Sequence, residues 1–126
     1  TEPALRLKKI YDELSDIIDE YKPEFVSVEK LFFNKNVTNA ISVAEARGVI
    51  LLSAVLSGAS IREYTPMQVK MALTGYGKAD KKQMQNMIKI LLGLKSVPKP
   101  DDVADALAIA VCCSSCYKIE NINQGK

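Results

Sequence analysis

Apolar residues recur every three or four positions near the start of the chain, with acids and lysines between them. In a helix of 3.6 residues per turn these positions share one face, so the pattern predicts an amphipathic helix over residues 3 to 21 that ends at Lys22-Pro23. Residues 25 to 33 carry β-branched and aromatic side chains on both faces, which is typical of a strand covered on each side. A long helix is predicted over residues 38 to 56, and its second half is apolar all round, as in a deeply buried helix or a subunit interface.

The second half of the chain continues this alternation. A short strand is predicted over residues 60 to 65, and Thr65-Pro66 then opens another helix with a cap followed by proline at the first helical position. Asp80 and Gln83 resemble a capping box at the start of the next helix. Helices that alternate with strands in this way imply parallel strands joined by helical crossovers, so the predicted fold class is α/β.

The composition matches one ordinary globular domain. With 126 residues, of which 48% are hydrophobic and 25% charged, we expect a single domain over residues 1 to 117 and a frayed polar tail over residues 118 to 126. No uncharged apolar run reaches roughly 18 residues, and the first residues do not resemble a signal peptide, so we expect no membrane span and a cytoplasmic location. The net charge of +2 is too small for general polyanion binding, so a nucleic-acid surface would need a local cluster of basic residues. The lack of histidine excludes histidine-ligated zinc sites and nucleophiles activated by histidine.

Three cysteines, Cys112, Cys113 and Cys116, lie on the C-terminal part of the last apolar helix. Cys113 and Cys116 have the spacing of a redox pair. A reactive pair normally lies at a helix N-terminus, which stabilises the thiolate, and here the polarity is opposite. The three residues are therefore interpreted as small apolar side chains packed in a reducing cell.

Three carboxylates, of Asp101, Asp102 and Asp105, lie at the start of that helix, which follows Pro100. Asp101 and Asp102 are fully explained as caps that complement the positive end of the helix dipole. Asp102 and Asp105, however, stand at i and i+3 and share a face. Asp105 lies about one turn inside, between residues that look buried, where a carboxylate is costly unless a cation or hydrogen bonds compensate it. Helix caps and metal ligands both remain open interpretations.

Glu29 falls near the carboxyl end of the first predicted strand. In open α/β sheets ligands bind at that end, so a carboxylate there is well placed for chemistry. The alternative is a glutamate that points into water or pairs with Lys30 or Lys35.

Lysines crowd the start of the helix that Asp80 opens, at Lys78, Lys81 and Lys82. Positive charge at this end of a helix is unfavourable, so a compensating anion such as phosphate is expected. Tyr76, between two glycines, adds an exposed stacking surface on a mobile loop. The alternative is a turn whose lysines are simply solvated, because most runs of charged residues lie on the protein surface.

Together, these residues indicate metal-assisted chemistry on a phosphodiester. Glu29, Asp102 and Asp105 have the oxygen ligands that a hard cation such as Mg²⁺ prefers. Lysines, among them Lys70 and Lys81, would neutralise the phosphate while two metal ions hold the attacking water and the leaving oxygen.

Six ordered blocks of the sequence resemble the RuvC family, the bacterial Holliday junction resolvases, over roughly residues 5 to 112. Any one block by itself would be a weak signal, but their order and spacing together are specific. The blocks are Val28-Glu-Lys-Leu-Phe-Phe33, Glu45-Ala-Arg-Gly-Val-Ile-Leu-Leu52, Tyr64-Thr-Pro-Met-Gln-Val-Lys70, Gly75-Tyr-Gly77, Lys81-Lys-Gln-Met-Gln85 and Pro100-Asp-Asp-Val-Ala-Asp-Ala-Leu-Ala-Ile-Ala110.

The resemblance implies a ribonuclease H-like fold, with a mixed sheet flanked by helices. It further implies a homodimer through the helix of residues 38 to 56, paired magnesium-dependent nicks in a four-way junction in recombination and repair, and RuvA and RuvB as partners. Two Mg²⁺ ions per active site are expected, for which Mn²⁺ can substitute.

Individual roles follow from the same resemblance. Glu29, Asp102 and Asp105 match catalytic carboxylates that bind the metal. Lys70 and Lys81 match basic residues near the scissile phosphate. Phe32 matches an aromatic that contacts bases near the crossover, and Tyr76, Lys78, Lys81 and Lys82 are expected to contact DNA.

One departure from the family pattern is serious. The family begins with a strand that bears an Asp-x-Gly motif, followed by two more strands, and the first of those aspartates is the fourth catalytic ligand. The chain opens at what would be the first helix, so we expect the first three strands to be absent and this chain to be inactive by itself. Two alternatives stay open: a non-catalytic module of the same fold that binds junctions or dimerises, and a purely structural dimer in which the acids are caps.

Overall fold

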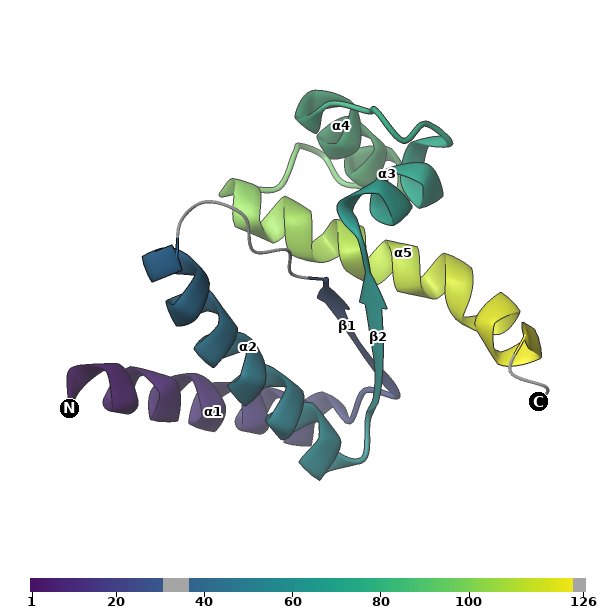
Figure 1. The fold of residues 1–126 in the computed structure, drawn as a ribbon. Coiled ribbons are helices and arrows are strands. Elements are labelled where there is room, and N and C mark those ends of the chain that lie inside the picture. The colour runs from purple at the N-terminus through teal and green to yellow at the C-terminus, as the bar shows by residue number, and fades with distance from the viewer. Residues whose placement is uncertain (31–36, 124–126) are drawn as a thin grey trace. The chain divides into compact units, whose positions relative to one another are not determined.

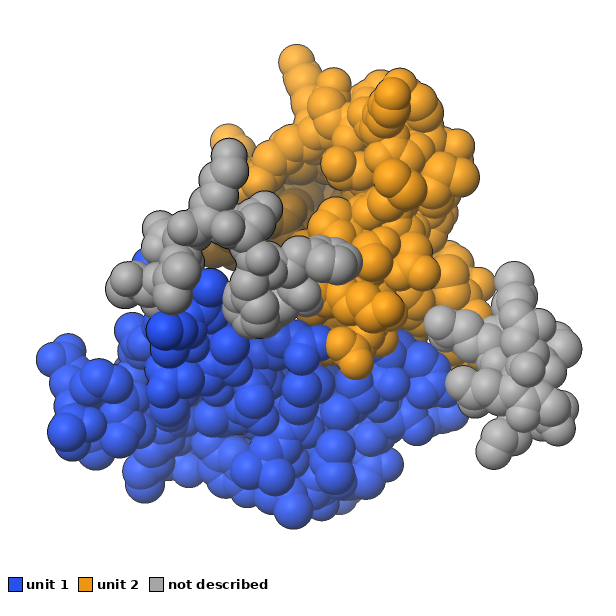
Figure 2. All heavy atoms as spheres, in the orientation of Figure 1, with its two compact units in different colours: residues 1–26, 31–62 blue, residues 27–30, 63–126 orange. Residues whose placement is uncertain are grey.

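The computed structural model describes the backbone of residues 1–30 and 37–123. Two strands, β1 (Phe25–Glu29) and β2 (Ser60–Tyr64), form a small parallel sheet. The helices are α1 (Glu2–Tyr21), α2 (Val37–Ser57), α3 (Pro66–Thr74), α4 (Lys81–Leu91) and α5 (Asp101–Asn123) (Figure 1). The chain divides into two compact units, one of residues 1–26 and 31–62 and the other of residues 27–30 and 63–126 (Figure 2). The single-domain expectation stays a prediction.

The predicted order of helices and strands is confirmed, and two boundaries differ. The first strand was expected to reach residue 33, whereas β1 ends at Glu29 and residues 31–33 lie outside the described part of the chain. The tail was expected to fray from residue 118, whereas α5 continues to Asn123. Backbone hydrogen bonding can extend a helix into polar sequence, because many polar side chains cost little helix propensity.

In the first unit, α1 packs against α2. Ile18 of α1 and Ala54 of α2 are buried. The Ser15 and Ser53 hydroxyls lie 3.0 Å apart and form a hydrogen bond, which satisfies the buried Ser53 side chain. The spacing predicted for the first helix therefore does bury one face against a neighbouring helix.

Part of the surface of α2 is apolar and exposed. The segment Asn39–Ser57 is, by length and composition, the one helix in the described residues that could cross a membrane, and 11% of it is buried in the structure. Its exposed large apolar side chains are 50% to 65% exposed and comprise Ile41, Val43, Leu52, Val55 and Leu56. Such a surface is typical of an interaction site, whether with a protein or a membrane.

In the second unit, α5 packs against α3 and α4 through small side chains. Ala104, Ala108 and Cys112 recur every four residues along α5, and all three are buried. The Cys112 thiol lies 3.9 Å from the backbone carbonyl of Gln68 in α3. Ile88 of α4 completes this core. Cys112 and Cys113 are buried free thiols, as the sequence predicts, and Cys116 is half-buried.

Both predicted N-terminal caps are present as capping boxes. The Thr65 hydroxyl accepts from the Gln68 backbone N–H at 3.1 Å, and the Gln68 side chain accepts from the Thr65 backbone N–H at 2.8 Å. Asp80 and Gln83 exchange the same pair of bonds, both at 2.8 Å. These bonds satisfy N–H groups that have no partner within the helix, and they fix where α3 and α4 begin.

We expect Thr65→Ala to lower the free energy of unfolding by about 1 kcal/mol, because the substitution removes the acceptor for the first turn of α3. Urea denaturation followed by circular dichroism measures this change. Thr65→Ser is the matched control and should retain most of the stability, since it keeps the hydroxyl. Equal destabilisation by both substitutions would show that the cap is not the cause.

Candidate active site

The second unit contains a cavity of about 460 Å³ with charged groups on its wall. Glu29 comes from β1, Lys70 from α3, Lys81 from α4 and Asp105 from α5, so each of these four elements contributes one charge. The rest of the lining is mostly small or apolar and consists of Pro66, Val69, Ala79, Asp80, Met84, Gln85, Ala104, Ala106, Ala108 and Ile109. Four of the residues predicted from the sequence therefore lie around one hollow.

Glu29 is the last residue of β1, whereas the sequence predicted it near the carboxyl end of a strand that continued to residue 33. Just after it, the backbone N–H of Lys30 donates to the Tyr64 carbonyl at the end of β2, at 2.9 Å. Two residues before it, the Ser27 hydroxyl donates to the Ile109 carbonyl of α5, also at 2.9 Å. These bonds hold the end of β1 against the helix that carries Asp105.

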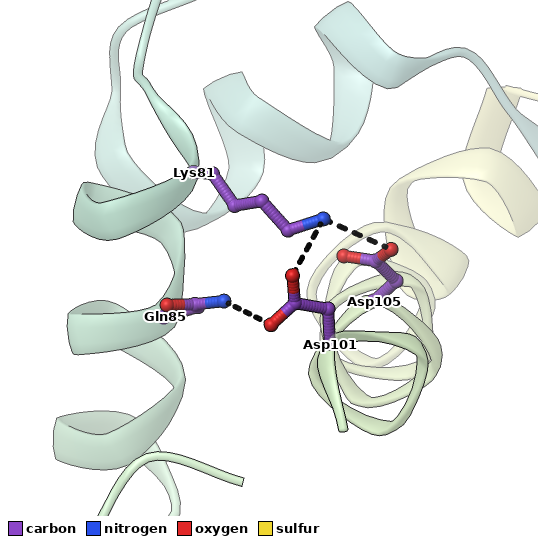
Figure 3. Close-up of polar contacts among 4 residues, drawn as sticks. All are labelled: Lys81, Gln85, Asp101 and Asp105. Carbon is purple, nitrogen blue, oxygen red and sulfur yellow. Dashed lines mark hydrogen bonds and ion pairs between the residues drawn. The ribbon is translucent and has the colours of Figure 1, made fainter. Parts of the chain in front are cut away.

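Lys81 forms the central ion pairs of this site (Figure 3). Its ammonium nitrogen lies 3.4 Å from Asp101 Oδ2 and 3.8 Å from Asp105 Oδ2. The Gln85 amide donates to the other carboxylate oxygen of Asp101, at 3.1 Å. The three charged side chains are 56%, 62% and 64% exposed, so water screens each pair.

The expectation that Asp105 is buried is wrong. Its side chain is exposed, although Ala104 just before it and Ala108 one helical turn after it are buried. The buried stripe of α5 follows residues four apart from Ala104, and Asp105 is turned about 100° from Ala104 around the helix axis. Its carboxylate thus points to the cavity and to Lys81, and no buried charge needs compensation.

Asp101 and Gln85 belong to this group of contacts, and neither is predicted from the sequence as a site residue. Asp101 was interpreted as a cap, and it does lie in the first turn of α5 with Asp102. Its carboxylate oxygens nevertheless contact α4. The signal in the sequence was the i, i+4 spacing of Asp101 and Asp105, which places both on one edge of the helix.

Asp102 is exposed and does not line the cavity. Its predicted metal role stays a prediction. Phe32 lies outside the described residues, so its predicted contact with bases also stays a prediction.

The loop that carries Tyr76 is held by its neighbours. Gly75 ends α3 with φ +74°, a conformation that favours glycine. A Cβ on Gly77 would lie 3.3 Å from the Met67 side chain, so the loop passes close to α3. The Thr74 hydroxyl accepts from the Tyr76 backbone N–H at 3.0 Å. Tyr76 is 54% exposed, as expected. Lys78 and Lys82 are also exposed.

A metal ion in the cavity would need oxygen ligands from its wall. Among the side chains that the structure describes, in residues 1–30 and 39–117, no three of histidine, cysteine, aspartate or glutamate lie close enough together to form a metal site by themselves. Mg²⁺ does not require three, because it is commonly held by one or two carboxylates with water and phosphate oxygens. Glu29 and Asp105, both on the cavity wall, are compatible with that donor set.

Comparisons with known proteins agree on one family. The family model of the crossover junction endodeoxyribonuclease RuvC matches residues 1–113. The RuvC of Brevibacillus brevis is 57% identical over 96% of this chain and 73% of its own length, and that of Heliobacterium modesticaldum is 56% identical over 90% and 70%.

Solved structures give the same answer. The Thermus thermophilus RuvC structure matches with a TM-score of 0.87 and 36% identity, over 94% of this chain and 71% of that one. T. thermophilus RuvC in complex with Holliday junction substrate matches with a TM-score of 0.85 and 32% identity, over 94% and 72%. The predicted ribonuclease H-like α/β fold is thereby confirmed. This chain belongs to the RuvC family of crossover junction endodeoxyribonucleases.

Proposed function

We propose that this chain forms part of an endonuclease that resolves four-way DNA junctions by metal-dependent hydrolysis of phosphodiester bonds in recombination and repair. The observation that carries the proposal is the cavity that brings Glu29 and Asp105 together with Lys70 and Lys81. Carboxylates that can hold a cation, next to ammonium groups that can bind a phosphate, are the pair of functions that this reaction needs.

Nucleases of the RuvC family are metal-dependent in general. We propose Mg²⁺, two ions per site and replaceable by Mn²⁺, with Glu29, Asp102 and Asp105 as ligands from this chain. When bound, the metal activates water and stabilises negative charge on the phosphate. Lys70 and Lys81 hold the phosphate by charge and stabilise the additional negative charge on it as the bond breaks.

Junction DNA is the proposed substrate because a solved structure of T. thermophilus RuvC holds a Holliday junction. Tyr76 offers an exposed ring on which a base can stack, and Lys78 and Lys82 add exposed positive charge around it. We propose that these three residues and Lys81 contact DNA, and that Phe32 contacts bases near the crossover.

Glu29→Gln and Asp105→Asn should each lower the rate of Mg²⁺-dependent junction cleavage by the full-length protein about 100-fold or more, since each removes a charged oxygen ligand. Junction binding should persist, because losing a negative charge does not weaken attraction to DNA. Cleavage of a synthetic four-way junction and a gel-shift assay measure the two effects.

Glu24→Gln and Asp19→Asn are the matched controls for these two variants, because they neutralise exposed acids outside the cavity. Both controls should cleave at the rate of the unmodified protein. Unchanged rates for Glu29→Gln and Asp105→Asn would refute the assignment of the carboxylates.

Lys78→Ala and Lys82→Ala should each weaken junction binding and reduce the slope of log K against log salt concentration by about 1, because each lysine releases one counterion from a phosphate. Fluorescence anisotropy with a labelled junction at several salt concentrations measures the slope. Lys9→Ala, which removes an exposed lysine of α1, is the control and should leave the slope unchanged.

We further propose a homodimer through α2. The uncovered leucines and valines of this helix are too many for a solvated surface. We propose that a second copy of the chain covers them and that α2 does not span a membrane, since Glu45 and Arg47 would place two charges within the apolar stretch. The proposed location is the cytoplasm, and RuvA and RuvB are the proposed partners in branch migration.

The double variant Leu52→Asp/Leu56→Asp should weaken the dimer about 100-fold or more, because two leucines on one edge of α2 lose their burial. Sedimentation velocity over a range of concentrations measures the change. Leu5→Asp alters an exposed leucine of α1 and is the control that should stay dimeric. A dimer that resists the double variant would exclude this face of α2.

A non-catalytic junction-binding or dimerisation module is the second candidate. The described side chains contain no cluster of three metal-ligating groups, which is compatible with such a module, although Mg²⁺ does not require three. Such a module would bind junctions equally well with and without Mg²⁺. Because a ligand that binds only the folded state stabilises it, the module would also show no increase in Tm with Mg²⁺.

A further inference from the structure

We infer that Asp101 is a positioning residue for the proposed cleavage reaction, and that with Gln85 it holds the Lys81 ammonium beside Asp105 at the wall of the cavity. This inference rests on the proposed function. Asp101 does not itself line the cavity, so its effect must be transmitted through Lys81.

Lys81 needs a partner from another helix. It is the first residue of α4, and the residues three and four positions ahead, Met84 and Gln85, carry no charge. The carboxylate just before it, Asp80, accepts the backbone N–H of Gln83 as part of the capping box. The carboxylates that do reach its ammonium group come from the first two turns of α5.

Asp101 is the nearer of these two partners, at 3.4 Å against 3.8 Å for Asp105. Its carboxylate is also oriented from a second direction, because Gln85 donates to the other oxygen at 3.1 Å. Lys81 and Gln85 stand at i and i+4 on α4, so the Asp101 carboxylate bridges one turn of that helix (Figure 3). A carboxylate with both oxygens engaged has less freedom than one held by a single exposed ion pair.

The contact of Asp101 with Lys81 and Gln85, here called the tether, matters most when a metal ion is bound in the cavity. Asp105 can use its negative charge to bind that ion, and a cation bound there would repel the neighbouring Lys81 ammonium group. Asp101 lies away from the cavity lining and keeps its negative charge next to Lys81 in that state. The Lys81 charge therefore stays at the cavity wall, where the phosphate would lie.

Asp101→Asn in the full-length protein should lower the single-turnover rate of junction cleavage about three- to tenfold, which matches the modest strength of an exposed, hydrogen-bonded ion pair. The half-saturating Mg²⁺ concentration and the junction Kd should not change. Asp101→Glu should restore part of the rate, because it keeps the charge. Asp19→Asn, an exposed acid of α1, is the control.

A double-mutant cycle with Lys81→Met tests whether Asp101 acts through Lys81. The Asp101→Asn substitution should have no further effect on the rate in the Lys81→Met background. An equal loss in both backgrounds, or a higher Mg²⁺ requirement in Asp101→Asn, would overturn the inference and make Asp101 a metal ligand instead.

A second measurement does not depend on cleavage. NMR relaxation of the Lys81 Cε group in the DNA-free protein should show a lower order parameter in Asp101→Asn and in Gln85→Met than in the unmodified protein. If the Lys81 order parameter is the same in the variants and in the unmodified protein, the tether is refuted, even if the protein cleaves junctions. If the order parameter falls in the variants but the unmodified protein does not cleave junctions, the tether is supported and the proposed function is rejected.

Discussion

The close packing of α5 against α3 and α4 is the constraint on which the candidate site depends. Helices can approach closely only where the side chains between them are small, and Ala104, Ala108 and Cys112 provide such a stripe along α5. The next positions around that helix are thereby turned to the edge of the contact. Asp101 and Asp105 occupy that edge, which is why two carboxylates lie within reach of a lysine from α4.

The positive charge of Lys81 at the start of α4 is compensated within the second unit. Lys81 and Lys82 lie at the positive end of the helix dipole, an unfavourable place for cations, and their crowding suggested an external anion such as phosphate. For Lys81 the compensating anions are two carboxylates of α5. Lys82, exposed one position further on, makes no ion pair within the described residues and remains available to a phosphate. Neighbouring lysines of one turn thus differ in their surroundings, because Lys81 is paired within the described part of the unit and Lys82 is not.

In the first unit, the contrast between the two helices is equally informative. The amphipathic α1 packs against α2 and buries Ile18, although Leu5, Ile17 and Tyr21 stay exposed. The more apolar α2 keeps five large apolar side chains exposed, because one neighbour covers one side of a helix. Its exposed apolar side chains are the physical reason to propose that a second copy of the chain covers them.

The sequence by itself determined the order of the elements, the helix caps at Thr65 and Asp80, and the place of Glu29 near the carboxyl end of a strand. These features depend on residues within one helical turn or one strand, so local spacing encodes them. The six ordered blocks also determined the family, which the comparisons confirm.

Only the tertiary structure decided that Asp105 is exposed and that Asp101 and Gln85 hold Lys81. The contact joins α4 to a residue 20 positions further along the chain than Lys81, and the distance between those helices depends on which of their faces are buried. Periodicity predicts that α5 has an apolar face, but its nearly continuous apolar sequence leaves the direction of that face open, and packing against α3 and α4 selects it.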